Sequence, residues 1–84
     1  MITVRIYCPL DHSDFESTNS IVKEAFLKHD LEHKIHNITS EEIIYQSRIK
    51  MVPHIVINSQ VVYCGSCPKL EEMDIILKRM GFIK

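Results

Sequence analysis

The segment from residue 52 to residue 63 places the strictest constraint on the fold of this chain. It reads V-P-H-I-V-I-N-S-Q-V-V-Y, with β-branched apolar residues on both sides of a polar turn at 58–60. This pattern predicts two short strands, 52–58 and 61–63, joined as a β-hairpin. The rest of the fold is therefore expected to be built around an antiparallel pair near the C-terminus.

Strand and helix patterns alternate before this hairpin. Residues 2–7 alternate apolar and polar side chains and predict a strand, and residues 8–15 contain a proline and two aspartates and predict a loop. Residues 17–29 place their apolar side chains at helical spacing, and 31–38 form a second strand candidate. The first half of the chain is thus predicted to be strand, helix, strand.

Two further helices complete the predicted order. Thr39 with Glu42 matches a capping box that begins a short helix. Cys67-Pro68 is expected to open the last helix, because proline suits the first helical position, and Gly81 is expected to end it. The predicted fold class is α/β, in the order β-α-β-α-β-β-α. We expect a four-stranded mixed sheet with helices on both faces, forming one domain over residues 1–84.

The charge, the hydropathy and the cysteine count of the chain indicate which partners and which compartment to expect. Ten Lys and Arg against eleven Asp and Glu leave no excess positive charge, so we expect no nucleic-acid partner. No apolar run approaches the roughly 20 residues that a membrane helix needs, so no membrane partner is expected. The N-terminus does not match a secretory signal, and three cysteines is an odd count for a disulfide framework. A cytoplasmic protein with reduced thiols is the expectation.

The hairpin segment Val52 to Asn58, together with the element order, resembles the glutaredoxin branch of the thioredoxin fold. In that family a similar Val-Pro segment carries a cis-proline, which implies that Pro53 is cis here. The resemblance also implies that extended peptides bind along this edge, at Val52, Pro53, His54 and Ser66. Short phage glutaredoxins are similar in having a long loop after the first strand, as residues 8–15 would form.

The sequence departs from this family at the first helix. The family's Cys-x-x-Cys pair is expected near residues 16–19, where this chain has Glu16-Ser17-Thr18-Asn19. A thiolate is stabilised by a helix N-terminus, whereas a glutamate there cannot attack a disulfide. Ser17, Thr18 or Asn19 is expected to cap the helix. Glu16 and Ser17 are then candidates for lining the binding groove, without a catalytic role.

The one Cys-x-x-Cys of the chain is Cys64-Gly65-Ser66-Cys67, and three interpretations of the cysteines remain open. Cys67, expected at a helix N-cap, could be a nucleophile with Cys64 as its partner. Cys8, Cys64 and Cys67 could cluster at one sheet edge and, with His12, bind a metal or an iron–sulfur cluster. All three could be small buried residues. One Cys-x-x-Cys is weak evidence for zinc, so no metal site is assigned.

Histidines and the acidic loop add two expectations. His33 and His36 are expected on opposite faces of a strand, and His54 near the groove. Residues 11–16 carry three acidic side chains and no Lys or Arg, which works against glutathione as a cofactor and suits a partner with a basic surface.

The leading hypothesis is a degenerate glutaredoxin-like protein that binds another protein through the cis-proline edge. The alternative is an atypical thiol–disulfide oxidoreductase that uses Cys64 and Cys67.

Overall fold

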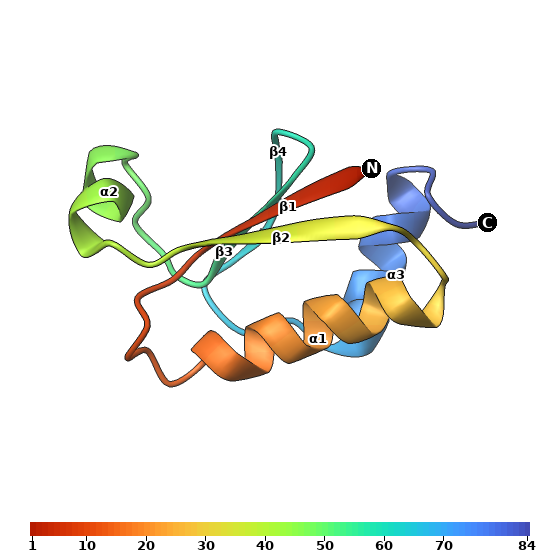
Figure 1. Ribbon diagram of the computed structural model, residues 1–84, viewed down its shortest axis with the longest axis horizontal. Helices are drawn as coiled ribbons and strands as arrows, with labels where there is room; N and C mark the ends of the chain where they lie inside the picture. Colours follow the sequence, from red (N-terminus) through yellow and green to blue (C-terminus); the bar gives the residue numbers. More distant parts are fainter.

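A computed structural model describes all residues, 1–84, and shows three helices and four strands. The elements follow the predicted β-α-β-α-β-β-α order (Figure 1). In chain order they are β1 (Ile2–Tyr7), α1 (Phe15–Lys28), β2 (His33–Ile38), α2 (Glu41–Gln46), β3 (His54–Ile57), β4 (Gln60–Cys64) and α3 (Leu70–Arg79).

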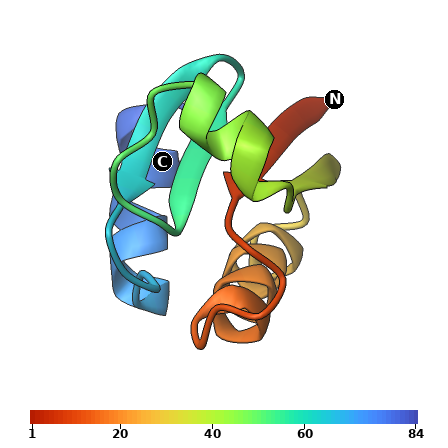
Figure 2. The same cartoon turned by 90° about the vertical axis from the view of Figure 1, so that its left-hand side faces the viewer.

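The four strands form one mixed sheet in the order β2-β1-β3-β4. β1 is parallel to β2 and antiparallel to β3, and β3 and β4 form the predicted antiparallel hairpin. Helices α1 and α3 lie side by side under one face of the sheet, while the short α2 lies beyond one end of the strands (Figures 1 and 2). The predicted α/β fold class, with a four-stranded mixed sheet in a thioredoxin-like arrangement, is confirmed. The expected cover on both faces differs, because α1 and α3 share one face and the short α2 lies at one end of the sheet.

The core lies between the sheet and the pair α1 and α3. Eleven buried residues from these elements form one cluster, in which Phe26 is the largest side chain. Its ring stacks on His33, with ring centroids 4.8 Å apart and planes 21° apart. Because strand residues alternate between faces, Val4 and Ile6 point into this core and Arg5 points away from it.

Two helix starts differ from the sequence prediction. α1 begins at Phe15 with Asp14 as its N-cap, so Ser17, Thr18 and Asn19 lie inside the helix and do not cap it. The N-cap of α2 is Ser40, whose Oγ accepts a hydrogen bond from the Ile43 N–H at 3.3 Å, and not Thr39. In each case several neighbouring polar residues are suitable caps, and the approach of the chain to the helix selects one.

The last helix also begins later than predicted. α3 starts at Leu70, so Cys67 and Pro68 precede it and Cys67 is not its N-cap. The Glu72 carboxylate accepts hydrogen bonds from the Lys69 N–H at 2.9 Å and the Tyr63 hydroxyl at 3.0 Å, and the Lys69 bond in particular lowers the pKa of Glu72. The helix therefore starts where the Glu72 carboxylate binds the free Lys69 N–H, and not at Pro68.

The other boundaries shift by one or two residues. β2 begins at 33 and not 31, β3 spans 54–57 within the predicted 52–58, and β4 extends the predicted 61–63 to 60–64. Gly81 ends α3 as predicted, with a φ of +84°. The Gly81 and Phe82 N–H groups donate to the carbonyls of Lys78 and Leu77, the pattern of a Schellman motif.

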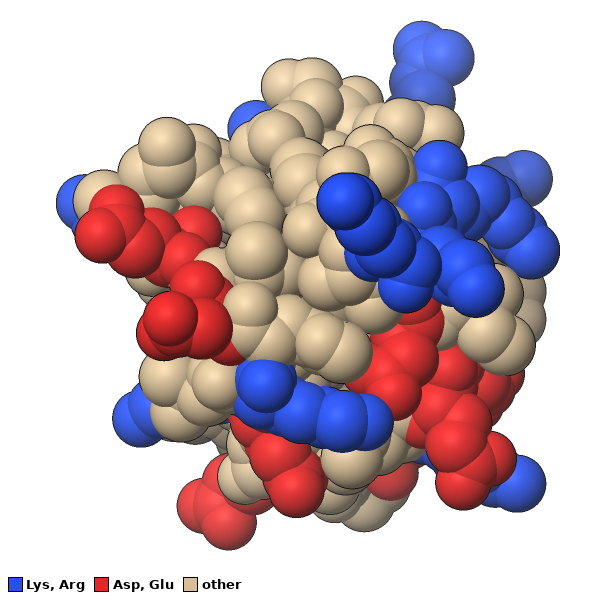
Figure 3. Space-filling model, turned by 90° about the vertical axis from the view of Figure 1, so that its right-hand side faces the viewer, with Lys and Arg blue, Asp and Glu red and all other residues tan.

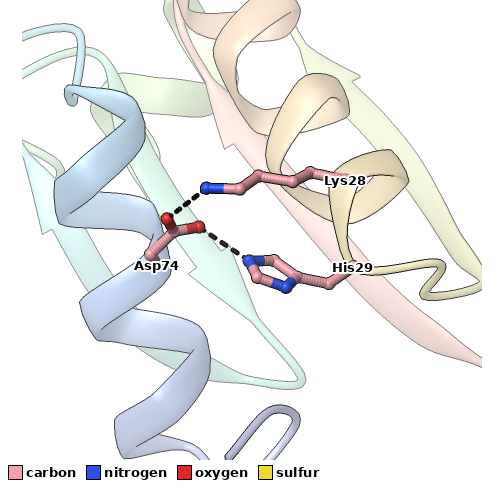
Figure 4. A network of polar contacts seen from close by, with 3 residues as sticks. All are labelled: Lys28, His29 and Asp74. Carbon is pink, nitrogen blue, oxygen red and sulfur yellow. Dashed lines mark hydrogen bonds and ion pairs between the residues drawn. The ribbon is translucent and has the colours of Figure 1, made fainter.

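A polar network joins the end of α1 to α3 (Figure 4). Asp74 accepts a hydrogen bond from Lys28 Nζ at 2.7 Å, and its other oxygen lies 2.8 Å from His29 Nε2. The hydrogen bond from Lys28, followed by that from His29, lowers the pKa of Asp74. All three side chains are partly exposed to solvent. We therefore expect these contacts to orient the two helices while contributing about 1 kcal/mol or less to stability.

None of the three helices has both the length and the apolar character needed to cross a lipid bilayer.

Candidate functional site

One end of the sheet gathers most of the residues that the sequence singles out. β1 ends there at Tyr7, β3 begins at His54 and β4 ends at Cys64, because β3 is antiparallel to both neighbours. The start of α1 lies at the same end, which Figure 2 views directly. The candidate site is therefore formed by loops 8–14, 47–53 and 65–69 around this end.

Tyr7, His54 and Cys64 form a row across three strands. Tyr7 pairs with His54, and His54 pairs with Cys64, so the three side chains share one face of the sheet. The rings of Tyr7 and His54 meet edge to face with centroids 5.8 Å apart. Burial lowers the pKa of His54, so its ring is neutral at neutral pH and suited to packing or to accepting a hydrogen bond.

The loop after β4 is tied to the start of β3. The Gly65 N–H donates to the Pro53 carbonyl at 2.9 Å, and the Val52–Pro53 peptide is cis. Gly65 has a φ of +97°, and a Cβ there would lie 2.7 Å from Cε of Met51. A glycine is favoured at this position because the backbone is left-handed, whereas the Met51 methyl group is the end of a flexible side chain and can move aside.

The segment before Pro53 exposes free backbone groups. No hydrogen bond in the chain involves the backbone of Lys50, Met51 or Val52. Met51 is 57% exposed, and Val52 is half-buried. Residues 51–53 form a bend, and the unpaired N–H and C=O groups of 50–52 can bond to a segment of another chain, with neighbouring side chains setting specificity.

None of the side chains at the start of α1 contains sulfur. Asp14 is the N-cap, followed by Phe15, Glu16 and Ser17. The Ser17 hydroxyl donates to the Asp14 carbonyl at 3.2 Å, and His12 Nδ1 accepts from the Asp14 N–H at 3.1 Å. Glu16 and Ser17 are exposed, and neither forms a hydrogen bond with the segment around Pro53. Their expected place in a binding groove stays a prediction.

Cys8 lies inside the core. It follows Tyr7, so it points to the opposite face of the sheet from Cys64, and it is completely buried. Burial, followed by the negative charges of Asp14 and Asp11, raises the pKa of the Cys8 thiol above its usual range. A thiol held in its protonated form is a poor nucleophile, so Cys8 has the environment of a structural cysteine.

This environment predicts a pH dependence. An unfolded thiol ionises near pH 8.5, whereas Cys8 keeps its proton to a higher pH, so its contribution to stability is complete below the unfolded pKa and is lost as pH rises toward the folded pKa. Between pH 8 and 10 we expect the free energy of unfolding to fall more steeply with pH for wild type than for Cys8→Ala. Urea denaturation at each pH measures this difference, and parallel pH curves would contradict it.

Cys64 is the last residue of β4, and Cys67 lies in the loop that follows it. Both are free; Cys64 is exposed and Cys67 is half-buried. Cys67 Sγ lies 3.4 Å from the Pro68 carbonyl, to which only a protonated thiol can donate. The predicted position of Cys67 at a helix N-cap is wrong, because the N-cap of α3 is Lys69.

The cysteines and histidines do not converge on a metal. No group of three His, Cys, Asp or Glu side chains has the spacing to hold an ion, and Cys8 and Cys64 lie on opposite faces of the sheet. The metal interpretation of Cys8, Cys64, Cys67 and His12 thus has no geometric support. His33 and His36 lie on opposite faces as predicted, His33 pairing with Ile2 and His36 with Arg5.

Comparison with known families agrees with this geometry. A family model described as a thioredoxin domain matches residues 7–78. The match covers most of the chain, from the end of β1 to the last turn of α3, and the chain therefore belongs to the thioredoxin domain family. The comparison with curated proteins gave no match.

Sequence reasoning missed three residues of this region. Met51 covers Gly65, Gly65 binds the Pro53 carbonyl, and Thr18 is completely buried with no hydrogen-bond partner for its hydroxyl. A glycine two residues after the predicted strand 61–63 was the one signal available for the first two. Thr18 gave no signal, since threonine within a helix is usually exposed or bonded to a carbonyl.

Proposed function

We propose that this thioredoxin-fold protein is a glutaredoxin-like module with a degenerate redox site that binds an extended segment of another protein. The binding surface is the Pro53 edge, defined by Met51, Val52, Pro53, His54 and Ser66. The observation that carries the proposal is the free backbone of residues 50–52 beside the exposed Met51 side chain. The loop of residues 8–14 supports a similarity to the short phage type.

The chemistry of the site favours binding over electron transfer. An oxidoreductase of this fold needs an activated thiol at the start of α1, where this chain has Asp14 and Glu16. Cys8 is buried with a raised pKa and cannot replace it. An edge that offers backbone hydrogen bonds keeps its affinity for a peptide strand without any thiol.

The charge around this edge suits a basic partner. Asp11 and Glu16 are exposed and Asp14 is half-buried, and all three lie in or next to the loop after β1. Neither ion pair of the chain involves them, so their charges are available to a ligand. Glutathione, which is anionic, is disfavoured as a cofactor by the same charges.

A peptide selection tests the proposal. Linear peptides selected from a displayed library on wild-type protein should be enriched in basic residues. Met51→Lys should weaken the binding of a selected peptide at least tenfold, or about 1.4 kcal/mol, because it places a charge where an apolar contact forms and this charge repels a basic peptide. Titration calorimetry measures the affinity.

Leu27→Lys is the matched control. Leu27 is 60% exposed, like Met51, but it lies at the far end of α1 from Pro53. We expect it to change affinity less than twofold. Equal losses for both variants, or a selection that enriches no peptide, would show that the Pro53 edge is not a peptide site.

The second candidate is thiol–disulfide exchange by Cys64 and Cys67, favoured by the accessibility of both free thiols. The thiolate of Cys67 would attack a substrate disulfide, release one substrate thiol and form a mixed disulfide. Cys64 would then attack the mixed disulfide, leaving a Cys64–Cys67 disulfide and a substrate reduced by two electrons.

Alkylation kinetics distinguish the two candidates. Under the binding proposal, Cys67 reacts slowly at pH 5 and Cys67→Ser binds selected peptides as wild type does. Rapid alkylation of Cys67 at pH 5, with loss of disulfide reduction in Cys67→Ser, would establish the redox function instead.

A further inference from the structure

A second surface, independent of the Pro53 edge, lies where β4 meets α3. β4 is an edge strand, and α3 lies beneath it on the same side of the molecule (Figure 2). Two hollows of about 160 and 210 Å³ lie between these elements. Both are lined by Val62, Ile76 and Arg79, so the two hollows lie next to each other, and we refer to them together as the groove.

Apolar side chains beside this groove are exposed to water. Val61 on β4 is 56% exposed and Ile75 on α3 is 54% exposed. Ile75 lines one hollow and Val61 the other. Exposed apolar side chains next to an unpaired sheet edge are typical of an interaction surface. We call the set Val61, Val62, Glu71, Ile75 and Arg79 the β4–α3 surface.

The charges on α3 indicate what covers this surface. The helix has acidic residues in its first turn and basic residues in its last, and Figure 3 shows basic side chains grouped beside acidic ones at the end of the molecule that carries the C-terminus. Glu71 precedes Ile75 by four residues, and Arg79 follows it by four. These three exposed side chains form one row along the helix.

This row is complementary to itself under a two-fold rotation. If two copies of α3 cross antiparallel at Ile75, Glu71 of each copy faces Arg79 of the other. Neither residue has an ion-pair partner within the chain, where the only ion pairs are those of Asp74. A two-fold contact of this kind uses the same patch on both copies.

We infer that the β4–α3 surface binds the same surface of a second copy of this chain. Ile75 packs on its counterpart at the two-fold axis, Val61 and Val62 close the apolar centre, and two Glu71–Arg79 pairs flank it. The pairing of β3 and β4 shifts register between Ile55 and Val56, which marks a bulge in β4. A bulge opposes regular edge pairing, so the contact is made by side chains and not by a continuous sheet.

Sedimentation equilibrium tests this inference. The contact is small and carries few apolar side chains, so wild type should shift from monomer toward dimer between about 10 μM and 1 mM at low salt. Glu71→Arg and Arg79→Glu should each weaken self-association at least tenfold, because each places like charges opposite one another. The double variant Glu71→Arg/Arg79→Glu exchanges the charges and should restore the dimer.

Glu41→Arg provides the control, since it reverses an exposed acidic residue on α2, which lies at the opposite end of the molecule from α3 (Figure 1). It should leave self-association unchanged, and circular dichroism should show that every variant is folded. A wild-type protein that stays monomeric at 1 mM would overturn the inference, as would a folded double variant that does not recover. Neither result affects the peptide test at the Pro53 edge, which depends on Met51.

Discussion

Replacing Phe26 with alanine is expected to lower the free energy of unfolding by about 3–5 kcal/mol, the largest stability effect of any single change we propose. Phe26 is completely buried, and its ring stacks on His33 with centroids 4.8 Å apart. Its carbonyl also accepts a hydrogen bond from the Leu31 N–H at 2.9 Å, which turns the chain from α1 toward β2. The alanine would leave a cavity at the centre of the single core cluster.

A loss of this size takes most of the stability of so small a protein. Domains typically have about 5–15 kcal/mol in total, and short chains bury less of their surface than long ones. Urea denaturation followed by circular dichroism measures the change. Leu27→Ala is the matched control, since Leu27 is the next residue but is 60% exposed, and it should change stability by about 0.5 kcal/mol or less. Similar losses for the two variants would mean that Phe26 does not hold the core together.

Replacing Thr18 with valine is expected to raise the free energy of unfolding by about 1–2 kcal/mol. Thr18 is completely buried in α1, and its hydroxyl has no hydrogen-bond partner. A buried hydroxyl without a partner costs about 1–3 kcal/mol of lost hydration, which valine avoids while keeping nearly the same shape. The expected sign is unusual, since most core substitutions destabilise.

Thr18→Ser makes this prediction specific. Serine keeps the unpaired hydroxyl and removes the methyl group, so it should destabilise by about 1 kcal/mol. Thermal and urea denaturation of the two variants should therefore shift in opposite directions from wild type. If Thr18→Val also destabilises, the hydroxyl has a hydrogen-bond partner in solution, such as a buried water molecule.

The environment of Thr18 is relevant to the proposal that this protein lacks a redox site at the start of α1. Thr18 lies in the N-terminal half of α1, close in sequence to Asp14 and Glu16, where proteins of this fold that exchange disulfides need an accessible thiol. In this chain the inward position near the helix start is sealed from solvent, and the nearest sulfur in the sequence, Cys8, is also buried. Both observations agree with a site that binds a partner through the neighbouring Pro53 edge.

The parts of this protein that the sequence predicted are those set by local periodicity. Alternation in residues 2–7 and the hairpin around 58–60 predicted the sheet, and helical spacing predicted α1 and α3. The same alternation placed His33 and His36 on opposite faces. These predictions hold because the period of two along a strand and of 3.6 along a helix is a property of the backbone itself.

The errors fall where competing local signals needed tertiary contacts to choose between them. Pro68 suggested a helix start, but Glu72 bonds the Lys69 N–H and the Tyr63 hydroxyl, and the helix begins at Leu70. Thr39 and Ser40 are both good caps, and only the course of the chain from β2 made Ser40 the cap. Cys67 therefore does not lie at the helix N-terminus that was expected to activate its thiol.

By itself, the sequence determined the order of strands and helices and the lack of sulfur where the first helix begins, because both follow from residue identity and local spacing. Only the tertiary structure decided that Cys8 points into the core, that Met51 lies over Gly65, and that the backbone of 50–52 is left free. These properties depend on which distant segments pack together, and burial and hydrogen-bond partners are set by that packing and not by neighbours in the chain.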